Sequence, residues 1–153
     1  MLIAHTADLQ IRNFKRHQEY LYAFENLYNS LKEKKPDYIV IPGDIAHTKT
    51  QISPEFVDIC ADFFYELSSL CRSVHITLGN HDGNLNNLSR LDSITPIVKK
   101  LRRDNIKLYK QSGVYNVDNL FYFIVFSCFD DKTKWPKYSY LTDEQKLSTN
   151  IVL

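Results

Sequence analysis

The sequence has few cysteines, which narrows the kinds of site that it can hold. Only Cys60, Cys71 and Cys128 occur in 153 residues, and no two of them form the CxxC pair used by zinc and redox sites. If Cys60 and Cys71 share a helix, they lie roughly 16 Å apart, which is too far for a disulfide. We therefore expect free thiols and a reducing compartment.

The sequence also lacks an excess of charge and a long apolar run. Its net charge is +1 with 24% charged residues, so binding to a polyanion would depend on a local patch. No segment approaches the roughly 20 apolar residues of a membrane span, and no basic-then-apolar signal segment follows Met1. These absences predict a soluble, intracellular protein with no membrane partner. The 44% of hydrophobic residues are enough for the core of one domain.

Strand and helix patterns alternate along the chain, which is typical of βαβ units around a parallel sheet. We expect strands at 2–6, 38–42 and 74–78, and amphipathic helices at 15–34 and from Pro54 to about Leu70. Ser53 has the position of an N-cap, with Pro54 as the first helical residue. A third helix is expected near 91–103, interrupted at Thr95-Pro96.

The last third of the chain predicts a hairpin and a loop. Strands at 114–117 and 120–126 are joined through Asp118-Asn119, and both turn residues tolerate left-handed conformations. Residues 130–140 are expected to form a polar loop, and 151–153 are too few for a finished element. The predicted class is α/β, with a β-α-β-α-β core followed by a hairpin.

Three of the predicted strands end in a polar cluster. Asp8 and Gln10 follow the first strand, Gly43-Asp44 follow the second, and the segment 79–82 (Gly-Asn-His-Asp) follows the third. Ligands of open parallel sheets lie outside the carboxyl ends of the strands, near a topological switch point. Three of only four glycines, namely Gly43, Gly79 and Gly83, fall in these clusters or directly after them, which indicates a backbone requirement there.

The side chains of the clusters predict chemistry on phosphate. Asp8 and Gln10 are two residues apart and would face one cation from an extended chain. Asp44 could bridge two cations, and Asn80 offers a neutral oxygen ligand. Oxygen ligands with few sulfurs suit manganese or magnesium better than a structural zinc. His81 would project toward the substrate.

These motifs, in this order, resemble the D-x-H, G-D and G-N-H-D series of the calcineurin-like metallophosphoesterases, whose fold is an αββα sandwich. More narrowly, residues 5–8 and 43–47 resemble the double-strand-break-repair nucleases of the SbcD type. The segment 89–96 resembles phage and giant-virus members of that branch. The resemblance covers residues 1 to about 130.

The resemblance implies a metal-dependent DNA exonuclease or endonuclease that works in DNA repair or recombination. It implies two divalent ions, most often manganese, which activate a water for attack on a phosphodiester. The implied metal ligands are Asp8, Gln10, Asp44 and Asn80. His81 would be the general acid for the leaving oxygen.

The resemblance also implies the surroundings of the site. His47 and Asp82 would support the ligands or contact DNA. Independently of the resemblance, cations beside the motif loops are expected to contact phosphates, because counterion release favours cations near the DNA backbone; these are Arg12, Arg16 and Arg90. The implied partners are DNA and a coiled-coil SMC-like ATPase subunit, with a homodimer left open. The implied location is the cytoplasm of a bacterial or virus-infected cell.

Two departures from the family pattern bear on activity. Gln10 stands where the family has a histidine, so the first metal would be held more weakly. No histidine follows His81, whereas the family takes three further histidine ligands from later strands. We therefore interpret residues 1–153 as the amino-terminal part of a nuclease domain that lacks the later metal-binding strands, and expect this form to be nearly inactive.

Two other functions remain open from the sequence. The chain could be another phosphatase or phosphodiesterase of the same superfamily, acting on a small substrate. It could also be a non-catalytic scaffold, for which Gln10 is the sequence support. The basic run 99–103 is interpreted as a solvated helix end rather than a phosphate site.

Overall fold

The computed structural model describes residues 1–48 and 51–153, which form two compact units, Met1–Leu108 and Tyr109–Leu153. No helix among these residues has both the length and the apolar character needed to cross a membrane. The elements that begin in the first unit are, in chain order, β1 (Ile3–His5), α1 (His17–Lys34), β2 (Tyr38–Pro42), α2 (Pro54–Leu70), β3 (Ser73–Thr77), α3 (Thr95–Leu101) and β4 (Ile106–Tyr109).

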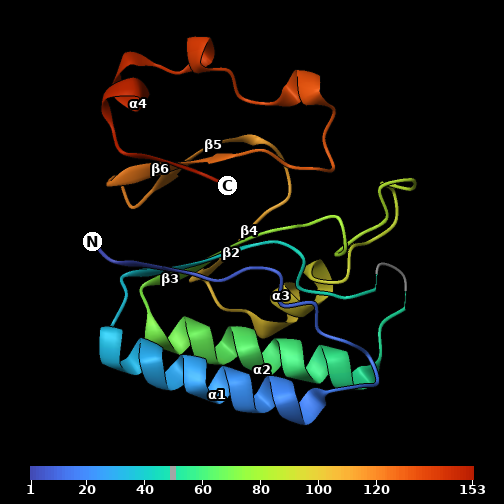
Figure 1. The fold of residues 1–153 in the computed structure, drawn as a ribbon. Helices are drawn as coiled ribbons and strands as arrows, with labels where there is room; N and C mark the ends of the chain where they lie inside the picture. The colour runs from blue at the N-terminus through green and yellow to red at the C-terminus, as the bar shows by residue number, and fades with distance from the viewer. Residues whose placement is uncertain (49–50) are drawn as a thin grey trace. The chain divides into compact units, whose positions relative to one another are not determined.

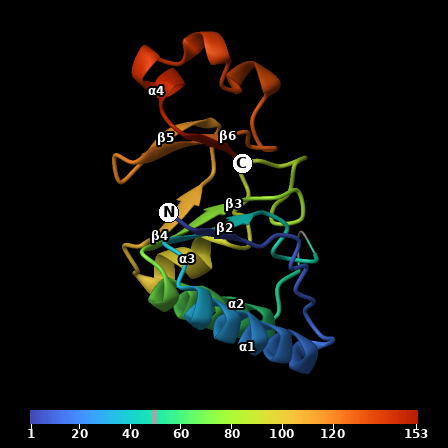
Figure 2. The ribbon, with the colours of Figure 1, turned by 60° about the vertical axis from the view of Figure 1, so that its left-hand side comes forward.

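The first unit is built on a sheet with the strand order β1-β2-β3-β4. β1 pairs with β2 and β2 with β3 in parallel, with Ile3 opposite Tyr38 and Tyr38 opposite Ser73. Parallel crossovers are right-handed, so successive strands added on one side place their helices on the same face. Figures 1 and 2 show α1 and α2 side by side on one face of this sheet. The strand order contains no reversal, so the predicted switch point does not lie within this sheet.

Apolar contacts hold the two long helices together. Phe24 of α1 and Phe63 of α2 have ring centroids 4.2 Å apart, and Phe63 is fully buried. α2 begins as expected, because the hydroxyl of Ser53 accepts the N–H of Phe56 and Pro54 is the first helical residue. β2 and β3 are buried along almost their whole length, as expected for the central strands of a parallel sheet.

The second unit contains a three-stranded sheet with the order β5-β6-β7, formed by β5 (Gly113–Val117), β6 (Phe121–Val125) and β7 (Asn150–Val152). The hairpin β5–β6 is antiparallel, and β7 pairs with β6 in parallel. Between β6 and β7 lie the single turns η1 (Lys132–Lys134) and η2 (Tyr138–Tyr140), then α4 (Asp143–Leu147).

The predicted α/β class with a parallel sheet is confirmed, whereas several local expectations were wrong. α3 is limited to Thr95–Leu101, since Asp92 accepts the N–H of Thr95 and Pro96 follows at the helix start. The expected loop at 130–140 contains two helical turns, and residues 151–152 belong to a strand. β4 and α4 were not expected at all.

Candidate functional site

The loops that follow β1 and β2 run side by side and are joined by backbone hydrogen bonds. The N–H of Gln10 donates to the carbonyl of Asp44 at 3.0 Å, and the N–H of Ile11 donates to the carbonyl of Ile45 at 2.8 Å. In return, the N–H of His47 donates to the carbonyl of Ile11 at 3.1 Å. These bonds place the first two polar clusters next to each other, at the carboxyl ends of their strands.

The backbone of these loops is not extended, so the extended chain predicted for Asp8 and Gln10 is wrong. Their φ angles are 57° and 48°, and that of Asp44 is 51°, all in the left-handed region. The two side chains still approach, since the Gln10 amide Nε2 lies 3.3 Å from Asp8 Oδ1. Non-glycine residues with positive φ are uncommon and gather at functional sites. The strained backbone marks this cluster within the fold.

Two glycines allow the loop after β3 to lie against the loop after β2. A Cβ atom on Gly43, whose φ is 83°, would lie 2.5 Å from the nitrogen of Gly79. A Cβ atom on Gly79 would collide with the side chain and the backbone nitrogen of Asp44. The backbone requirement expected of these glycines is therefore a close approach of two chains.

His81 is held between Asp44 and His47. Its N–H donates to Asp44 Oδ1 at 2.9 Å, and its ring Nδ1 lies 3.0 Å from the carbonyl oxygen of His47. The rings of His47 and His81 are stacked, with centroids 6.4 Å apart and an angle of 23° between their planes. The loop after β3 thus meets the Asp44 carboxylate, and the loop after β1 bonds to the main-chain carbonyl of the same residue.

Asp82 is fully buried and fastens the loops from beneath. Oδ1 accepts the N–H groups of Ile45 and Ala46, at 2.9 Å and 2.8 Å, and Oδ2 accepts the N–H of Gly79 at 2.8 Å. Burial raises the pKa of Asp82 to about 6, while the three N–H groups act in the opposite direction. Asp82 has no exposed surface, and its carboxylate joins the loops after β2 and β3, which favours support of the loops over contact with DNA.

Gln10 lies between Asp8 and His47. Its Oε1 is 2.9 Å from His47 Nδ1, while its Nε2 faces Asp8. Its main-chain carbonyl accepts the hydroxyl of Tyr20 at 2.7 Å. Sequence reasoning assigned Tyr20 only to the apolar face of a helix, and no sequence signal distinguishes this tyrosine from the others on that face.

The predicted metal ligands supply oxygen atoms suited to a hard divalent cation. Asp8 and Asn80 are exposed, and Asp44 is partly exposed. These carboxylate and amide oxygens match the ligands that magnesium and manganese take. However, no group of three or more His, Cys, Asp or Glu side chains in 1–48 and 51–153 is arranged to hold a metal ion. The side-chain oxygen of Gln10 is already engaged by His47.

The predicted phosphate-contacting arginines lie on the surface beside the loops. Arg12, Arg16 and Arg90 are all exposed. Arg16 precedes α1 with a φ of 65°, and its Nε lies 3.7 Å from a carboxylate oxygen of Glu19. These three side chains thus remain accessible to a ligand, and their role in binding stays a prediction.

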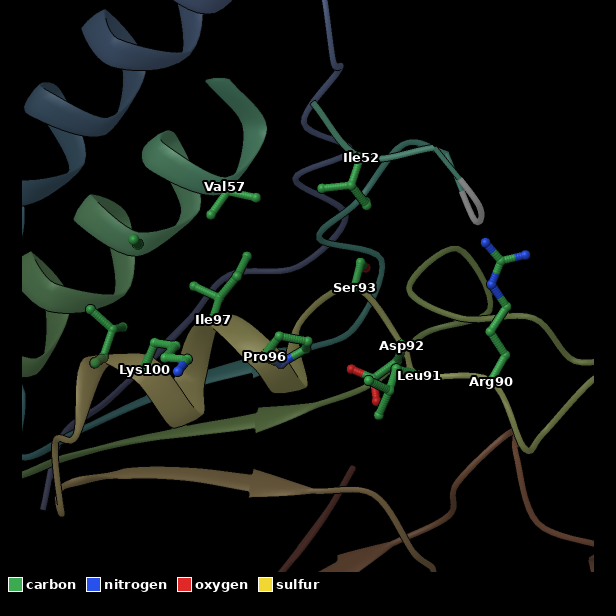
Figure 3. Close-up of a pocket in the computed structure, with 11 residues that line it drawn as sticks. Ile52, Val57, Arg90, Leu91, Asp92, Ser93, Pro96, Ile97 and Lys100 are labelled. Atoms are coloured by element: carbon green, nitrogen blue, oxygen red, sulfur yellow. The ribbon is translucent and has the colours of Figure 1, made fainter. Parts of the chain in front are cut away.

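Arg90 also borders an apolar groove in the first unit. The groove has a volume of about 460 Å³ and is lined by parts of α2 and α3 and by the segment 90–93. Figure 3 shows Val57 of α2 and Ile97 of α3 directed toward each other, and Arg90 at the far end of the groove. Asp92, which also lines it, uses both carboxylate oxygens to cap the start of α3. The groove therefore presents mainly apolar surface.

Comparisons with known proteins agree with this architecture. The chain is similar to the uncharacterized protein R555 of Acanthamoeba polyphaga mimivirus, with 40% identity over 133 residues, which are 84% of this chain and 10% of that protein. It is similar in structure to the Pseudomonas putida nuclease MPE, with a TM-score of 0.52 and 18% sequence identity, over 80% of this chain and 52% of that one. The chain thus spans about a tenth of the mimivirus protein and half of the nuclease.

The second of these comparisons bears on the fold alone, because the identity is low. Family membership rests on a third comparison, in which the sequence profile of the calcineurin-like phosphoesterases matches residues 1–149. That match includes all three polar clusters and the strands that carry them. The chain belongs to the calcineurin-like phosphoesterase family.

Proposed function

We propose that this chain is part of a metal-dependent nuclease that hydrolyses DNA phosphodiesters. The observation that carries the proposal is the meeting of three loops around Asp44, which receives the N–H of His81 and whose carbonyl receives the N–H of Gln10. Family membership supports phosphoester hydrolysis. A nuclease with a similar fold is the precedent for choosing a phosphodiester as the substrate class in this proposal.

In this proposal, Asp8, Asp44 and Asn80 hold divalent cations, of which manganese is the first choice and magnesium the second. When bound, such a cation supplies Lewis acidity and lowers the pKa of a bound water. The carbonyl of His47 fixes the ring of His81 through Nδ1, so Nε2 is the nitrogen that can give a proton to a leaving oxygen. Arg12, Arg16 and Arg90 are proposed to contact DNA phosphates.

The cellular setting of the proposal is DNA repair or recombination, in a complex with a coiled-coil ATPase. The motifs in 5–8, 43–47 and 89–96 support this branch of the family. The proposal includes the expectation that residues 1–153 by themselves bind manganese weakly and turn over slowly, because no histidine follows His81.

A second candidate function is a non-catalytic scaffold. It is favoured by the hydrogen bond that occupies the side-chain oxygen of Gln10, and by the absence of a three-residue His, Cys, Asp or Glu group in the described chain. A chain of this kind would keep the fold and lose the metal.

Manganese-dependent cleavage of linear DNA, measured on the protein in the form that its host produces, tests the proposal. The Asp44→Ala variant should lose cleavage and manganese binding by calorimetry, whereas Gln18→Ala, an exposed change on α1, should retain both. Hydrolysis of a small chromogenic diester without DNA cleavage would overturn the proposal in favour of another phosphoesterase. No binding at millimolar manganese would leave only the scaffold.

A further inference from the structure

We propose that Gln10 is a positioning residue that sets the tautomer of His47. It accepts the proton of His47 Nδ1 through its side-chain oxygen, so that Nε2 carries the free lone pair. This inference rests on the proposed function only for its relevance to substrate binding, because His47 is expected to lie near the substrate. The tautomer is a property of the chain itself and can be measured without any hydrolysis.

The orientation of the Gln10 amide follows from its other neighbour. Nε2 lies 3.3 Å from Asp8 Oδ1, and Oε1 lies 2.9 Å from His47 Nδ1. A carboxylate only accepts hydrogen bonds, so the amide N–H group must face Asp8. The reversed amide would bring two oxygen atoms together and lose a hydrogen bond. The oxygen of Gln10 therefore faces His47.

An amide oxygen can only accept, so the facing ring nitrogen must donate. His47 Nδ1 then carries a proton, and the neutral imidazole is left with an unprotonated Nε2. In a free histidine side chain the other tautomer, with the proton on Nε2, is the favoured one. Asp8 thus acts on His47 through Gln10, although the carboxylate and the ring do not bond to each other.

Gln10 is well held for this role. Its N–H donates to the carbonyl of Asp44 at 3.0 Å, and its carbonyl accepts the hydroxyl of Tyr20 at 2.7 Å. Both bonds fix the main chain at a φ of 48°. With the backbone fixed on both sides, the side-chain amide is directed into the space between Asp8 and His47.

The ring of His81 is held in the same tautomer, with the proton on Nδ1. His81 Nδ1 lies 3.0 Å from the carbonyl of His47, which is an acceptor only, so this nitrogen also donates. The two stacked rings, with centroids 6.4 Å apart, therefore both use Nδ1 in a hydrogen bond to the protein, and within 1–48 and 51–153 neither Nε2 has a hydrogen-bond partner. Each Nε2 accepts a hydrogen bond when its ring is neutral. When the ring is protonated, Nε2 donates a hydrogen bond, as an oxygen of a phosphate group requires.

Nitrogen NMR of the chain labelled at histidine tests the inference. Long-range correlations between ring protons and nitrogens, recorded on the neutral ring at mildly alkaline pH, distinguish the two tautomers. We expect His47 to be protonated at Nδ1. In Gln10→Met, which keeps the chain length and removes both hydrogen bonds, the major form should become the Nε2–H tautomer.

Asp8→Ala gives a sharper test, because Asp8 does not bond to the ring. Removal of the carboxylate frees the amide to reverse, so His47 should become a mixture of both tautomers. Gln18→Met, at an exposed position of α1, is the matched control and should leave the spectrum of His47 unchanged. The ring signals of His75, which lies in the core against Ser73, report whether each variant is folded.

Two results would overturn the inference: an Nε2–H tautomer of His47 in the unmodified chain, or an unchanged His47 spectrum in folded Gln10→Met. An unchanged His47 spectrum in Asp8→Ala would show that Asp8 does not orient the Gln10 amide, which would also overturn the inference. None of these readouts depends on DNA cleavage. A failure of the proposed nuclease function would therefore leave the tautomer result intact, and the reverse also holds.

Discussion

Asp82 Oδ1 accepts the backbone N–H of Ile45 at 2.9 Å, and this bond joins the turn after β3 to the turn after β2 across 37 residues of sequence. The same carboxylate accepts the N–H groups of Ala46 and Gly79. A buried carboxylate with three main-chain donors holds two loops in one arrangement. The positions of Asp44 and His81 depend on it, because they lie in those two loops.

Asp82→Ala should lower the free energy of unfolding by about 3 kcal/mol or more, since each buried N–H left without an acceptor costs roughly 1–3 kcal/mol. Asp82→Asn should cost less, because its side-chain oxygen can still serve Ile45 and Ala46. Urea unfolding followed by circular dichroism measures both. Asp104→Ala, at an exposed position, is the control and should change stability by under about 0.5 kcal/mol. Equal stabilities of Asp82→Ala and Asp104→Ala would contradict the role of Asp82.

Gly79→Ala should disrupt the contact between two loops. Its Cβ atom would collide with the side chain and the backbone nitrogen of Asp44, which cannot move without breaking the bond to His81. Overpacking of this kind costs about 1–3 kcal/mol. Gly113→Ala is the matched control, because the nearest atoms to its Cβ atom would belong to the side chain of Tyr115, at 3.2 Å and beyond. Thermal unfolding should show a clearly lower midpoint for Gly79→Ala, and similar midpoints would argue against the close approach.

The three thiols should react with an alkylating reagent in a fixed order. Cys128 is exposed and should be labelled first. Cys71 is partly buried, and burial raises its pKa to about 11, so at pH 8 little of it is the reactive thiolate. Cys60 has no exposed surface, and burial raises its pKa further, so its labelling should require unfolding.

The labelling rate of Cys71 should also rise with pH. Raising the pH toward about 11 increases the thiolate fraction of Cys71 by about tenfold per pH unit, and its labelling rate should rise in proportion. Mass spectrometry of digested samples, taken at intervals, assigns each site. Labelling of Cys60 before Cys71 under native conditions would contradict the burial of α2.

The hairpin turn at Asp118-Asn119 should be destabilised by a residue that disfavours a positive φ angle. Asp118 and Asn119 have φ angles of 51° and 57°, and the N–H of Leu120 donates to the carbonyl of Val117 at 2.9 Å. A left-handed conformation costs an ordinary residue about 1–2 kcal/mol, so Asn119→Val should destabilise the hairpin by that amount. Asn119→Gly, which suits such a turn, should be neutral or stabilising. Hydrogen exchange of the β6 amides compares the two variants.

Features that depend on neighbouring residues were accessible from the sequence. The Ser53 cap, the Pro54 start of α2 and the Asp118-Asn119 turn are confirmed, because each is specified within about four residues. α4 could also have been found, since Thr142 and Gln145 form a capping box that the sequence displays. β4 gives a weaker signal, because it has only four residues and a lysine at its second position.

The candidate site shows the limit of such reasoning. The sequence indicated that polar clusters follow β1, β2 and β3, and the parallel sheet brings these strand ends to one edge. It did not indicate the left-handed backbone of Asp8 and Gln10, or the bond from Gln10 to His47 across 37 residues. It also left open whether Asp82 would face solvent, and the structure buries it completely.

The sequence by itself determined the order of β1, α1, β2, α2 and β3, the α/β class and the three polar clusters, because these follow from periodicity, caps and ordered motifs. Only the tertiary structure decided which atoms of those clusters meet. That choice depends on pairing between loops distant in sequence, on the space left by Gly43 and Gly79, and on hydrogen bonds that a buried carboxylate must satisfy. Such contacts have no local signature, since each joins two segments that are distant in sequence.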